Sequence, residues 1–401
     1  VSEVNAKPGK TKWMGEGQDF DFTSEAAKAL RKDVEQLLQD CEAGLVKNVV
    51  FVDTLKDERR ELEKVKLKKT RVFSAGPQHF VVAFRKYFLP FSAWIMHNRV
   101  ENEIAVGTNP FSMDWHNIAM RMRSKGDKII AGDFSNFDGS LNAQILWAIF
   151  WKIFVPWLES IECSDDQHEA NLRTCTSLWT HLVHSVHVCE DNLYMWTHSQ
   201  PSGNPFTVII NSLYNSIVMR VVWQYVMAKE NPKLRTMNHF NEHVALVCYG
   251  DDNLLNISDE VIGIYNQTTI SEAMRWIGHE YTDETKSGEA TPYRTLSEVR
   301  FLKRGFRQDP LLCRWVAPLK LEVVYEMLNW TRKGVNPEDV TMMNIDTALR
   351  EATYHGREAF DKLKSSILDK QHLLSTRPKI LLFEEYLFDM AASEGEDLPF
   401  N

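Results

Sequence analysis

The chain has 401 residues, enough for two or three domains or for one large fold with subdomains. Hydrophobic residues make up 44% and charged residues 25%, which is ordinary for a soluble globular enzyme. The net charge of −9 argues only weakly against a nucleic-acid partner, because nucleic acid responds to local basic patches rather than to the average.

The six cysteines form no Cys-x-x-Cys pair, which fits reduced thiols in a cytosolic setting better than a disulfide framework. No apolar run reaches the length of a transmembrane segment, and the N-terminus carries no signal peptide. The chain begins with Val1 rather than Met, so we expect a processed product or a trimmed piece of a longer protein.

The N-terminal part predicts a helix, a strand and then a basic segment. A cap signal at Thr23-Ser24 opens a helical pattern that continues to about Glu42, and residues 49–52 form a short buried strand. Residues 56–71 hold eight basic and four acidic residues. Their second half, with Lys64, Lys66 and Lys68 alternating with apolar residues, predicts a strand with these lysines on one face.

Such a row of cations suits a triphosphate or the backbone of a nucleic acid. A solvated strand edge that lysines protect from aggregation explains the same pattern, and the segment taken alone favours this second interpretation.

An apolar strand over residues 129–133 is predicted to present Asp133 at its end. Asp138 follows in a turn, before a helix that begins near Leu141 and continues past Trp151. Asp138 could reach a sugar hydroxyl or cap this helix, and the two roles are compatible.

Residues 152–198 are expected to form a helical region rich in Trp and His. His181, His184 and His187 recur every three residues, but their spacing matches no standard zinc finger. Packed or surface histidines are therefore the preferred interpretation, and a structural zinc ion is the minor one.

A loop at residues 200–206 then enters a helix that is expected to run to about Met227. Ser202 and Gly203 predict a flexible loop whose backbone can approach a ligand. Thr207 and Asn211 lie four residues apart on one helical face, which suits sugar recognition, although ordinary capping explains the stretch as well.

The sequence Tyr249-Gly250-Asp251-Asp252 lies between two apolar runs and predicts a β-hairpin with two carboxylates at its tip. Adjacent acids repel each other unless a cation or a proton lies between them, and oxygen ligands suit Mg²⁺ or Mn²⁺. Asp133 would complete a three-acid metal site. A polar turn that simply faces solvent is the alternative for this stretch alone.

Two basic features follow the hairpin. Lys286 lies in a loop over residues 281–287, and a strand–turn–strand pattern over residues 299–306 carries Lys303 and Arg304 at its tip. From Pro318 onward the pattern is helical. The expected helices cover residues 319–331, a segment starting at residue 336, and residues 357–368.

In combination, these stretches resemble the RNA-dependent RNA polymerases of positive-strand picorna-like viruses, including the dicistrovirus-like and iflavirus-like viruses of insects. The resemblance covers roughly residues 48–310 and rests on six motifs in the family's order. The matching segments are Arg60, Lys69 and Arg71 within residues 56–71 (motif F), residues 133–138 (motif A), Ser202, Gly203, Thr207 and Asn211 (motif B), residues 249–252 (motif C), Lys286 (motif D) and residues 301–304 (motif E).

The resemblance implies an α+β right-hand fold, with an antiparallel palm sheet backed by helices, partial fingers and a helical thumb. Residues 1–125 would form the fingers, and residues 126–310 the palm, with an inserted fingers segment at about 152–200. Residues 311–401 would form the thumb. The family's index-finger segment and its Thr-Ser-rich motif G are expected to lie before residue 1.

The implied activity is template-directed RNA synthesis from ribonucleoside triphosphates by two-metal nucleotidyl transfer, which would replicate a viral genome. Asp133 and Asp251 would bind Mg²⁺ or Mn²⁺, with Asp252 in support, and Lys286 would be the general acid for pyrophosphate. The remaining implied contacts are Arg60, Lys69 and Arg71 to the triphosphate, Asp138, Thr207 and Asn211 to the 2′-hydroxyl beside the Ser202-Gly203 loop, and Lys303 and Arg304 to the primer.

The implied partners are an RNA template, a primer or product strand, ribonucleoside triphosphates and, as a family expectation only, a genome-linked protein primer. The implied location is the host cytoplasm, at membrane-associated replication complexes reached through partners. Two alternatives stay open: a reverse transcriptase, which also carries a Tyr-x-Asp-Asp hairpin, and a catalytically silent RNA-binding or scaffold protein derived from a polymerase.

Overall fold

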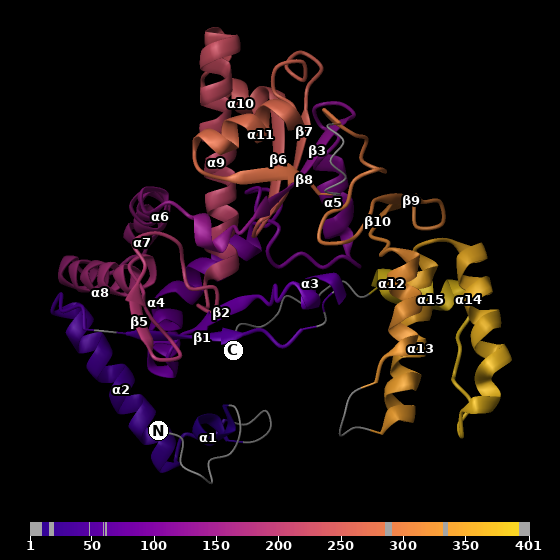
Figure 1. The fold of residues 1–401 in the computed structure, drawn as a ribbon, viewed down its shortest axis with the longest axis horizontal. Helices are drawn as coiled ribbons and strands as arrows, with labels where there is room; N and C mark the ends of the chain where they lie inside the picture. The colour runs from indigo at the N-terminus through magenta and orange to yellow at the C-terminus, as the bar shows by residue number, and fades with distance from the viewer. Residues whose placement is uncertain are drawn as a thin grey trace. The chain divides into compact units, whose positions relative to one another are not determined.

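The protein is described by a computed structural model, drawn in Figure 1, for residues 10–15, 20–47, 49–58, 60, 62–284, 291–331 and 336–392. The chain divides into two compact units. Unit 1 comprises Val1–Trp94 and Asn136–Tyr214, and unit 2 comprises Ile95–Ser135 and Asn215–Asn401. Two long helices, α4 (Gln78–His97) and α9 (Thr207–Glu230), run from one unit into the other.

Unit 1 contains a four-stranded sheet in the order β2-β1-β4-β5. Its strands are β1 (Val50–Leu55), β2 (Val72–Ala75), β4 (Val186–Cys189) and β5 (Asn192–Met195). β1 and β4 pair in parallel, and the other pairs are antiparallel. The helices of this unit are α1 (Thr11–Met14), α2 (Glu25–Glu42), α3 (Leu62–Lys66), α6 (Ala143–Ile149), α7 (Val155–Glu159) and α8 (Asp165–Val183).

Several predicted elements of unit 1 are confirmed. Ser24 caps α2, because its Oγ accepts a hydrogen bond from the backbone N of Ala27. The helix expected near Leu141 is present as α6, and a π-helical segment, Phe150–Phe154, continues it into α7. Asn142 rather than Asp138 caps α6, since its side chain accepts from the N of Gln144, so the capping interpretation of Asp138 is wrong.

An aromatic core stabilises unit 1. Phe80, Phe84 and Phe88 recur every four residues along α4, and their side chains are fully buried. The rings of Phe84 and Phe88 stack with centroids 4.1 Å apart, and Phe88 also packs on Phe206, which directly precedes α9. The core therefore fixes the point at which α9 begins.

Two predictions in unit 1 are wrong. Lys64 and Lys66 lie on the short helix α3 and Lys68 has a φ of 53°, so the three lysines do not share a strand face. Leu, Glu and Lys are good helix formers, and Lys66 forms an ion pair of 2.6 Å with Glu63 three residues earlier. The helical prediction for residues 152–198 also fails beyond Val183, where the β-branched residues of β4 pair with β1.

Unit 2 is built on an antiparallel sheet in the order β6-β7-β3-β8, comprising β3 (Lys128–Ser135), β6 (Val244–Tyr249), β7 (Asp252–Ile257) and β8 (Glu280–Asp283). The predicted hairpin is confirmed, and the predicted strand is present but extends to Ser135, two residues beyond Asp133, because it pairs there with β8. The helix α5 (Met113–Arg121) packs its buried Trp115 and Ile118 with Ala131, Val247 and Leu254 of the sheet. The other helices before residue 300 are α10 (Met237–His243) and α11 (Gln267–Trp276), with a short 3-10 turn at Pro232–Leu234.

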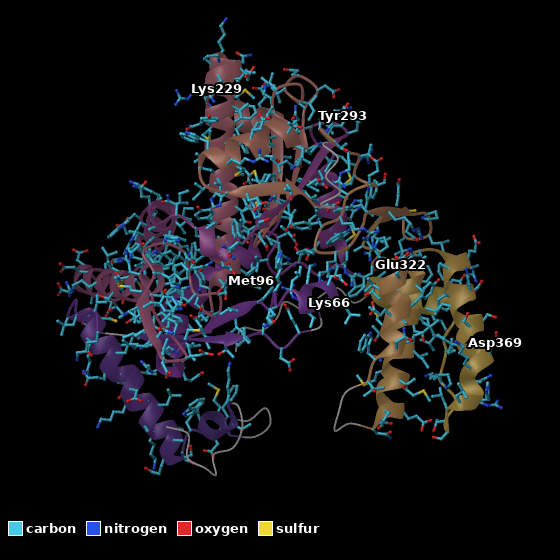
Figure 2. The ribbon with its side chains drawn as sticks, in the orientation of Figure 1. Lys66, Met96, Lys229, Tyr293, Glu322 and Asp369 are labelled. Carbon is cyan, nitrogen blue, oxygen red and sulfur yellow. The ribbon has the colours of Figure 1, made fainter. Side chains whose placement is uncertain are left out.

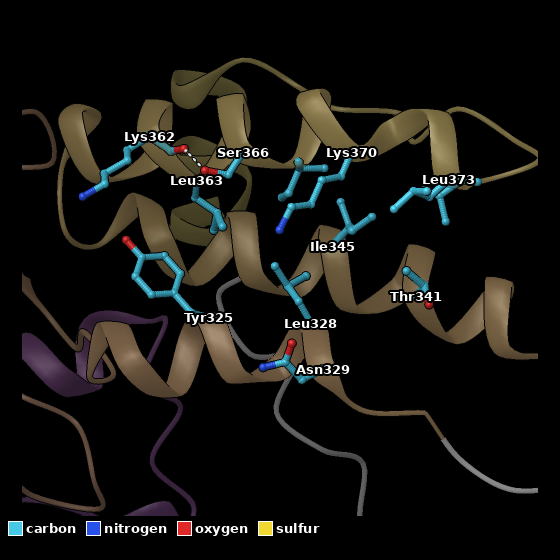
Figure 3. Close-up of a pocket in the computed structure, with 12 residues that line it drawn as sticks. Tyr325, Leu328, Asn329, Thr341, Ile345, Lys362, Leu363, Ser366, Lys370 and Leu373 are labelled. Atoms are coloured by element: carbon cyan, nitrogen blue, oxygen red, sulfur yellow. Dashed lines mark hydrogen bonds between the residues drawn. The ribbon is translucent and has the colours of Figure 1, made fainter.

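The C-terminal part of unit 2 is helical after a small hairpin of β9 (Arg307–Asp309) and β10 (Arg314–Val316). Its helices are α12 (Leu321–Glu326), α13 (Pro337–Thr353), α14 (Arg357–Lys370) and α15 (Phe383–Ala392). The first is shorter than predicted, because a 3-10 turn at Met327–Asn329 ends it. Figure 3 shows a pocket of about 560 Å³ between α12, α13 and α14, with apolar walls and Lys362 and Lys370 among its lining residues.

Within the part of the chain that the structure describes, no helix combines the length and the apolar character that crossing a bilayer requires.

Because Gly132 has no side chain, Tyr281 can pack directly against the centre of the unit 2 sheet. Gly132 pairs with Asn253 of β7 on one side and with Asp283 of β8 on the other. A Cβ at this position would overlap the ring and hydroxyl of Tyr281, which is fully buried.

We expect Gly132→Ala to lower the free energy of unfolding by about 3 kcal/mol or more, because Tyr281 has no free space into which to move. Urea unfolding monitored by circular dichroism measures this change. Gly263→Ala is the matched control, since nothing lies within 4 Å of the added carbon there. Equal effects of the two substitutions would contradict the packing argument.

Candidate active site

Three acidic residues meet close to the C-terminal end of β3, where the β6–β7 hairpin turns. Gly132 and Asn253 are the last pair that β3 and β7 form with each other, so the next residues, Asp133 and Asp252, lie side by side on neighbouring strands. Asp251 lies in the two-residue turn between β6 and β7. Gly250, at a φ of +62°, supplies the left-handed conformation that this tight turn requires.

A buried chain of hydrogen bonds supports the turn from below. Asn215 of α9 donates through its Nδ2 to the carbonyl oxygens of Gly250 and Asp251, both at 3.1 Å. Asn253 donates to the Oδ1 of Asn215 at 3.3 Å, and the Tyr281 hydroxyl donates to the Oδ1 of Asn253 at 2.7 Å. The sequence analysis missed Asn215, although its place four residues after Asn211 on the same helix was a usable signal.

The pKa of Asp252 is raised to about 7. Burial is the largest cause, and the negative charges of Asp251, Asp133 and Glu284 add to it, while Lys303 opposes it. The site therefore holds more negative charge than it can keep fully ionised without a cation.

Glu284 is a fourth acid that the sequence analysis missed. It follows β8, and its carboxylate accepts two hydrogen bonds from the backbone N of Arg300, at 2.9 and 3.0 Å. Arg294 pairs with it at 3.1 Å. No local sequence pattern marks this residue, because its partners lie in the loop that returns to the sheet.

The donor set fits a divalent cation in charge and in ligand type, since carboxylate oxygens are the ligands that Mg²⁺ prefers. Among the described residues, no group of three or more His, Cys, Asp or Glu side chains is already arranged as a metal-binding site. Asp133, Asp251 and Asp252 would therefore have to turn toward an ion in order to share it.

In unit 1, a second cluster of hydrogen bonds links Asp138 and Asn211, two of the residues that were predicted to contact the nucleotide. Asn211 donates from its Nδ2 to the Oδ1 of Asp138 at 2.7 Å. Gln200 fixes this amide by donating to the Oδ1 of Asn211, and Asn204 donates to the Oε1 of Gln200 at 3.1 Å. Burial raises the pKa of Asp138, whereas the bond from Asn211 and the charge of Arg71 lower it.

Gly203 lies against β2. Its N donates to the carbonyl oxygen of Ser74 at 3.0 Å, and a Cβ would overlap that oxygen. The glycine thus allows the loop to lie close against β2. Thr207 also supports the loop, because its hydroxyl contacts the carbonyl oxygens of Ser202 and Asn204 at 3.0 and 2.9 Å.

The basic segment contains its own counter-ion. Glu58 lies 3.1 Å from Arg71, 3.5 Å from Arg60 and 3.6 Å from Lys56. Arg60 also donates to the carbonyl oxygen of Lys69 at 2.9 Å. One carboxylate thus orders several cations while leaving them with a net positive charge.

Lys303 and Arg304, predicted together as RNA contacts, differ in the structure. Lys303 is exposed at the tip of a two-residue turn, where it and Leu302 have φ values of 66° and 52°. Arg304 points inward, with hydrogen bonds of 2.9 and 2.7 Å to both carboxylate oxygens of Glu351 and one of 2.7 Å to the carbonyl of Ala317. Its guanidinium is held by Glu351, so a contact of Arg304 with RNA would require this ion pair to open. Lys286 lies outside the described residues.

Two of the three histidines proposed as packed or surface residues have hydrogen-bonding partners, and the third, His181, is buried. His187 is buried in β4, where its ring contacts Asp53 at 3.0 Å and Ser185 at 2.7 Å. The Nε2 of His184 accepts from the indole of Trp147 at 3.2 Å. These contacts agree with the interpretation as packed side chains.

Comparison with known proteins shows to which protein family the chain belongs. A family model described as viral RNA-dependent RNA polymerase matches residues 2–372. The chain is 60% identical over 386 residues to the replicase polyprotein of Drosophila C virus (strain EB), and 56% identical over 395 residues to that of Cricket paralysis virus. These alignments cover 96% and 97% of this chain, and 22% of each polyprotein, so the chain spans about a fifth of these relatives.

A solved structure, the Sicinivirus 3Dpol RNA dependent RNA polymerase, shares the fold with a TM-score of 0.70 at 21% sequence identity, covering 89% of this chain and 70% of that one. The chain therefore belongs to the viral RNA-dependent RNA polymerase family, in the branch of positive-strand picorna-like viruses. The expected α+β fold and the resemblance to these polymerases are confirmed. The family copies RNA templates from nucleoside triphosphates and generally uses divalent metal ions.

The raised pKa of Asp252 makes stability depend on pH. Its carboxyl has a pKa of about 7 when folded and about 3.8 when unfolded, so between these values the folded state binds more protons. Without metal, the free energy of unfolding should fall as pH rises from about 4 to about 7, by roughly 1–2 kcal/mol after allowance for partial exposure.

Asp252→Asn should remove this dependence, whereas the exposed control Asp369→Asn should retain it. Urea unfolding at several pH values in the presence of a chelator measures the difference. An unchanged pH profile in Asp252→Asn would show that another group is responsible.

Proposed function

We propose that Asp133, Asp251 and Asp252 form the catalytic centre of this polymerase and bind Mg²⁺, which Mn²⁺ can replace. The observation that carries the proposal is the strand register that brings these acids together, at a place where burial and their mutual repulsion raise the pKa of Asp252. Bound divalent ions would activate the primer 3′-hydroxyl and stabilise the charge that develops on pyrophosphate. Asn215 and Asn253 keep the turn that carries Asp251 in place.

The basic segment would bind the incoming triphosphate through Arg60, Lys69 and Arg71. Glu58 pre-orders Arg60 and Arg71, and their contacts with it reduce the entropy lost when a phosphate group binds. The triphosphate would then compete with Glu58 for the same guanidinium groups.

The Asp138–Asn211 pair would recognise the ribose 2′-hydroxyl. The amide of Asn211 has a second N–H, and Asp138 has a second carboxylate oxygen, so together they offer a donor and an acceptor to one hydroxyl. Gln200 fixes the orientation of the amide. Thr207, with Ser202 and Gly203, would shape the loop beside this sugar site.

Lys303 would contact the primer strand, because it is exposed at the tip of its turn and its charge acts on Asp252. Lys286 keeps its proposed role as the general acid for pyrophosphate. Arg304, which pairs with Glu351, is not among the proposed RNA contacts.

The proposed palm, residues 126–310 with a fingers segment at about 152–200, includes the whole four-stranded sheet of unit 2. The proposed thumb, residues 311–401, includes α12 to α15, and residues 1–125 belong to the fingers. A genome-linked protein primer and a location at replication complexes in the host cytoplasm, reached through partners, complete the proposal.

Primer extension on an RNA template tests the catalytic assignment. Asp133→Ala and Asp252→Asn should each reduce Mg²⁺-dependent elongation by at least about a thousandfold while largely sparing RNA binding, since charge stabilisation in the transition state is lost. Asp369→Asn is the control. Elongation by Asp133→Ala at the original rate would refute the assignment.

If this chain and a longer segment of the same polyprotein are both inactive under these conditions, the result favours the alternative of a catalytically silent scaffold protein. Activity of the longer piece alone would instead show that upstream residues are needed.

The choice between ATP and dATP tests the sugar site. The intact chain should prefer ATP, and Asn211→Ala should reduce that preference about ten- to a hundredfold, which corresponds to the loss of a hydrogen bond to a charged group. Single-nucleotide incorporation kinetics measure the ratio, with the exposed Asn238→Ala as the control. A preference of the intact chain for dATP would favour the reverse transcriptase.

A further inference from the structure

A polar pocket of about 590 Å³ lies in unit 2, near the start of β6. Its walls come from the loop at residues 101–103, the end of α5 and the residues after it, α9, α10 and the first residues of β6. The acid cluster follows the other end of β6, so about six residues of strand, roughly 17–20 Å, separate the two sites. The proposed polymerase mechanism makes no use of this pocket.

One carboxylate in the pocket, that of Glu103, interacts with the guanidinium groups of both Arg220 and Arg121. Glu103 accepts hydrogen bonds from Arg220 at 2.6 and 2.9 Å, and from the Ser216 hydroxyl at 3.1 Å. Arg121 lies 3.6 Å from the same carboxylate, and its Nε donates to the carbonyl oxygen of Leu246 at 3.0 Å. Burial lowers the pKa of Arg121, which means that its charge is incompletely compensated.

The charges in the pocket do not balance. Arg121, Arg220 and Lys125 are all half-buried cations, and Lys125 forms no ion pair with any other described residue. Glu103 is the half-buried acid, while Glu101 is exposed and its charge is screened by water. Two positive charges therefore remain in excess at a site that is partly removed from water, which is unfavourable without an anion.

The backbone that presents Glu103 is strained. Val100 and Glu103 have φ values of 68° and 71°, which L residues rarely adopt, and least of all a β-branched residue. Two hydrogen bonds to β6 hold the loop in this form: Cys248 N donates to the Glu103 carbonyl and Ala105 N to the Cys248 carbonyl, both at 2.8 Å. Strain of this kind concentrates at functional sites.

We propose that this pocket binds a phosphate monoester. Arg220 neutralises Glu103, which leaves Arg121 and Lys125 for a phosphate dianion whose charge matches theirs. A carboxylate, with a single charge, would compensate only half of the excess. The polar side chains of Ser124 and Asn241 line the same pocket and suit the alcohol part of an ester. The ester belongs either to a soluble small molecule or to a lipid headgroup.

Binding is tested on the whole chain carrying Arg60→Gln and Arg71→Gln, so that phosphate cannot bind at the proposed triphosphate site. Inorganic phosphate and glycerol 3-phosphate serve as probes in isothermal titration calorimetry without divalent metal. Lys125→Met should weaken binding by about tenfold or more, because it removes one charged contact. Lys229→Met, which removes the same charge at the far end of α9 (Figure 2), should leave the dissociation constant unchanged.

A second arm distinguishes the two sources of the ester. Phosphatidylcholine vesicles with and without phosphatidic acid are sedimented with the same variants. Retention that requires phosphatidic acid and Lys125 identifies a lipid headgroup, whereas binding of glycerol 3-phosphate without such retention identifies a soluble ester. The proposal is overturned if neither probe binds, or if Lys125→Met and Lys229→Met behave alike in both arms.

Discussion

The sheet of unit 2 brings several carboxylates together, and their mutual repulsion is the constraint that the rest of this unit must satisfy. Asp133, Asp251 and Asp252 approach one another because the register of β3, β6 and β7 requires it, and Glu284 adds a fourth charge. Bringing these groups together costs free energy that the rest of the sheet must offset. The buried strand β6, which is apolar on both faces, and the hydrogen bonds beneath the turn supply that stabilisation.

The two clusters use different physics. The acids of unit 2 create an excess of charge that a cation would relieve, whereas the Asp138–Asn211–Gln200 cluster of unit 1 is a set of hydrogen bonds with one half-buried charge. A hydrogen-bonded cluster discriminates by shape and by the position of donors, because an unpaired buried polar group is costly. A cluster of charges therefore suits a reaction step that is the same for all nucleotides, whereas a cluster of hydrogen bonds suits discrimination between one sugar and another.

Sequence patterns predicted the elements whose signals are local. The apolar runs on either side of Gly250, and the apolar run that ends in Asp133, were sufficient to predict the strands that carry the acids. The strand prediction for the basic segment failed because Lys-x-Lys-x-Lys over five residues is compatible with a strand and with a short helix, and good helix formers together with an exposed ion pair favour the helix.

Long-range partners could not be predicted in this way. Lys303 and Arg304 are equally basic neighbours, and only the position of Glu351, 47 residues further along the chain, turns one of them inward. Glu284 is equally hidden in the sequence, since its partners include a backbone N–H. Gly203 was noticed for the correct property, its missing side chain, but the group that approaches it is the chain's own β2.

The hydrogen bonds from Tyr281 through Asn253 to Asn215 all run in one direction, and the last donor, Asn215, bonds to the turn at Gly250 and Asp251. This series of hydrogen bonds ends in the amide of Asn215, because only a donor can bond to the carbonyl oxygens of Gly250 and Asp251. An aspartate at position 215 would have nearly the same size, yet it would present an acceptor to acceptors and bring one more anion beneath an already crowded set. The residue closest in shape is therefore the least suitable substitute at this position.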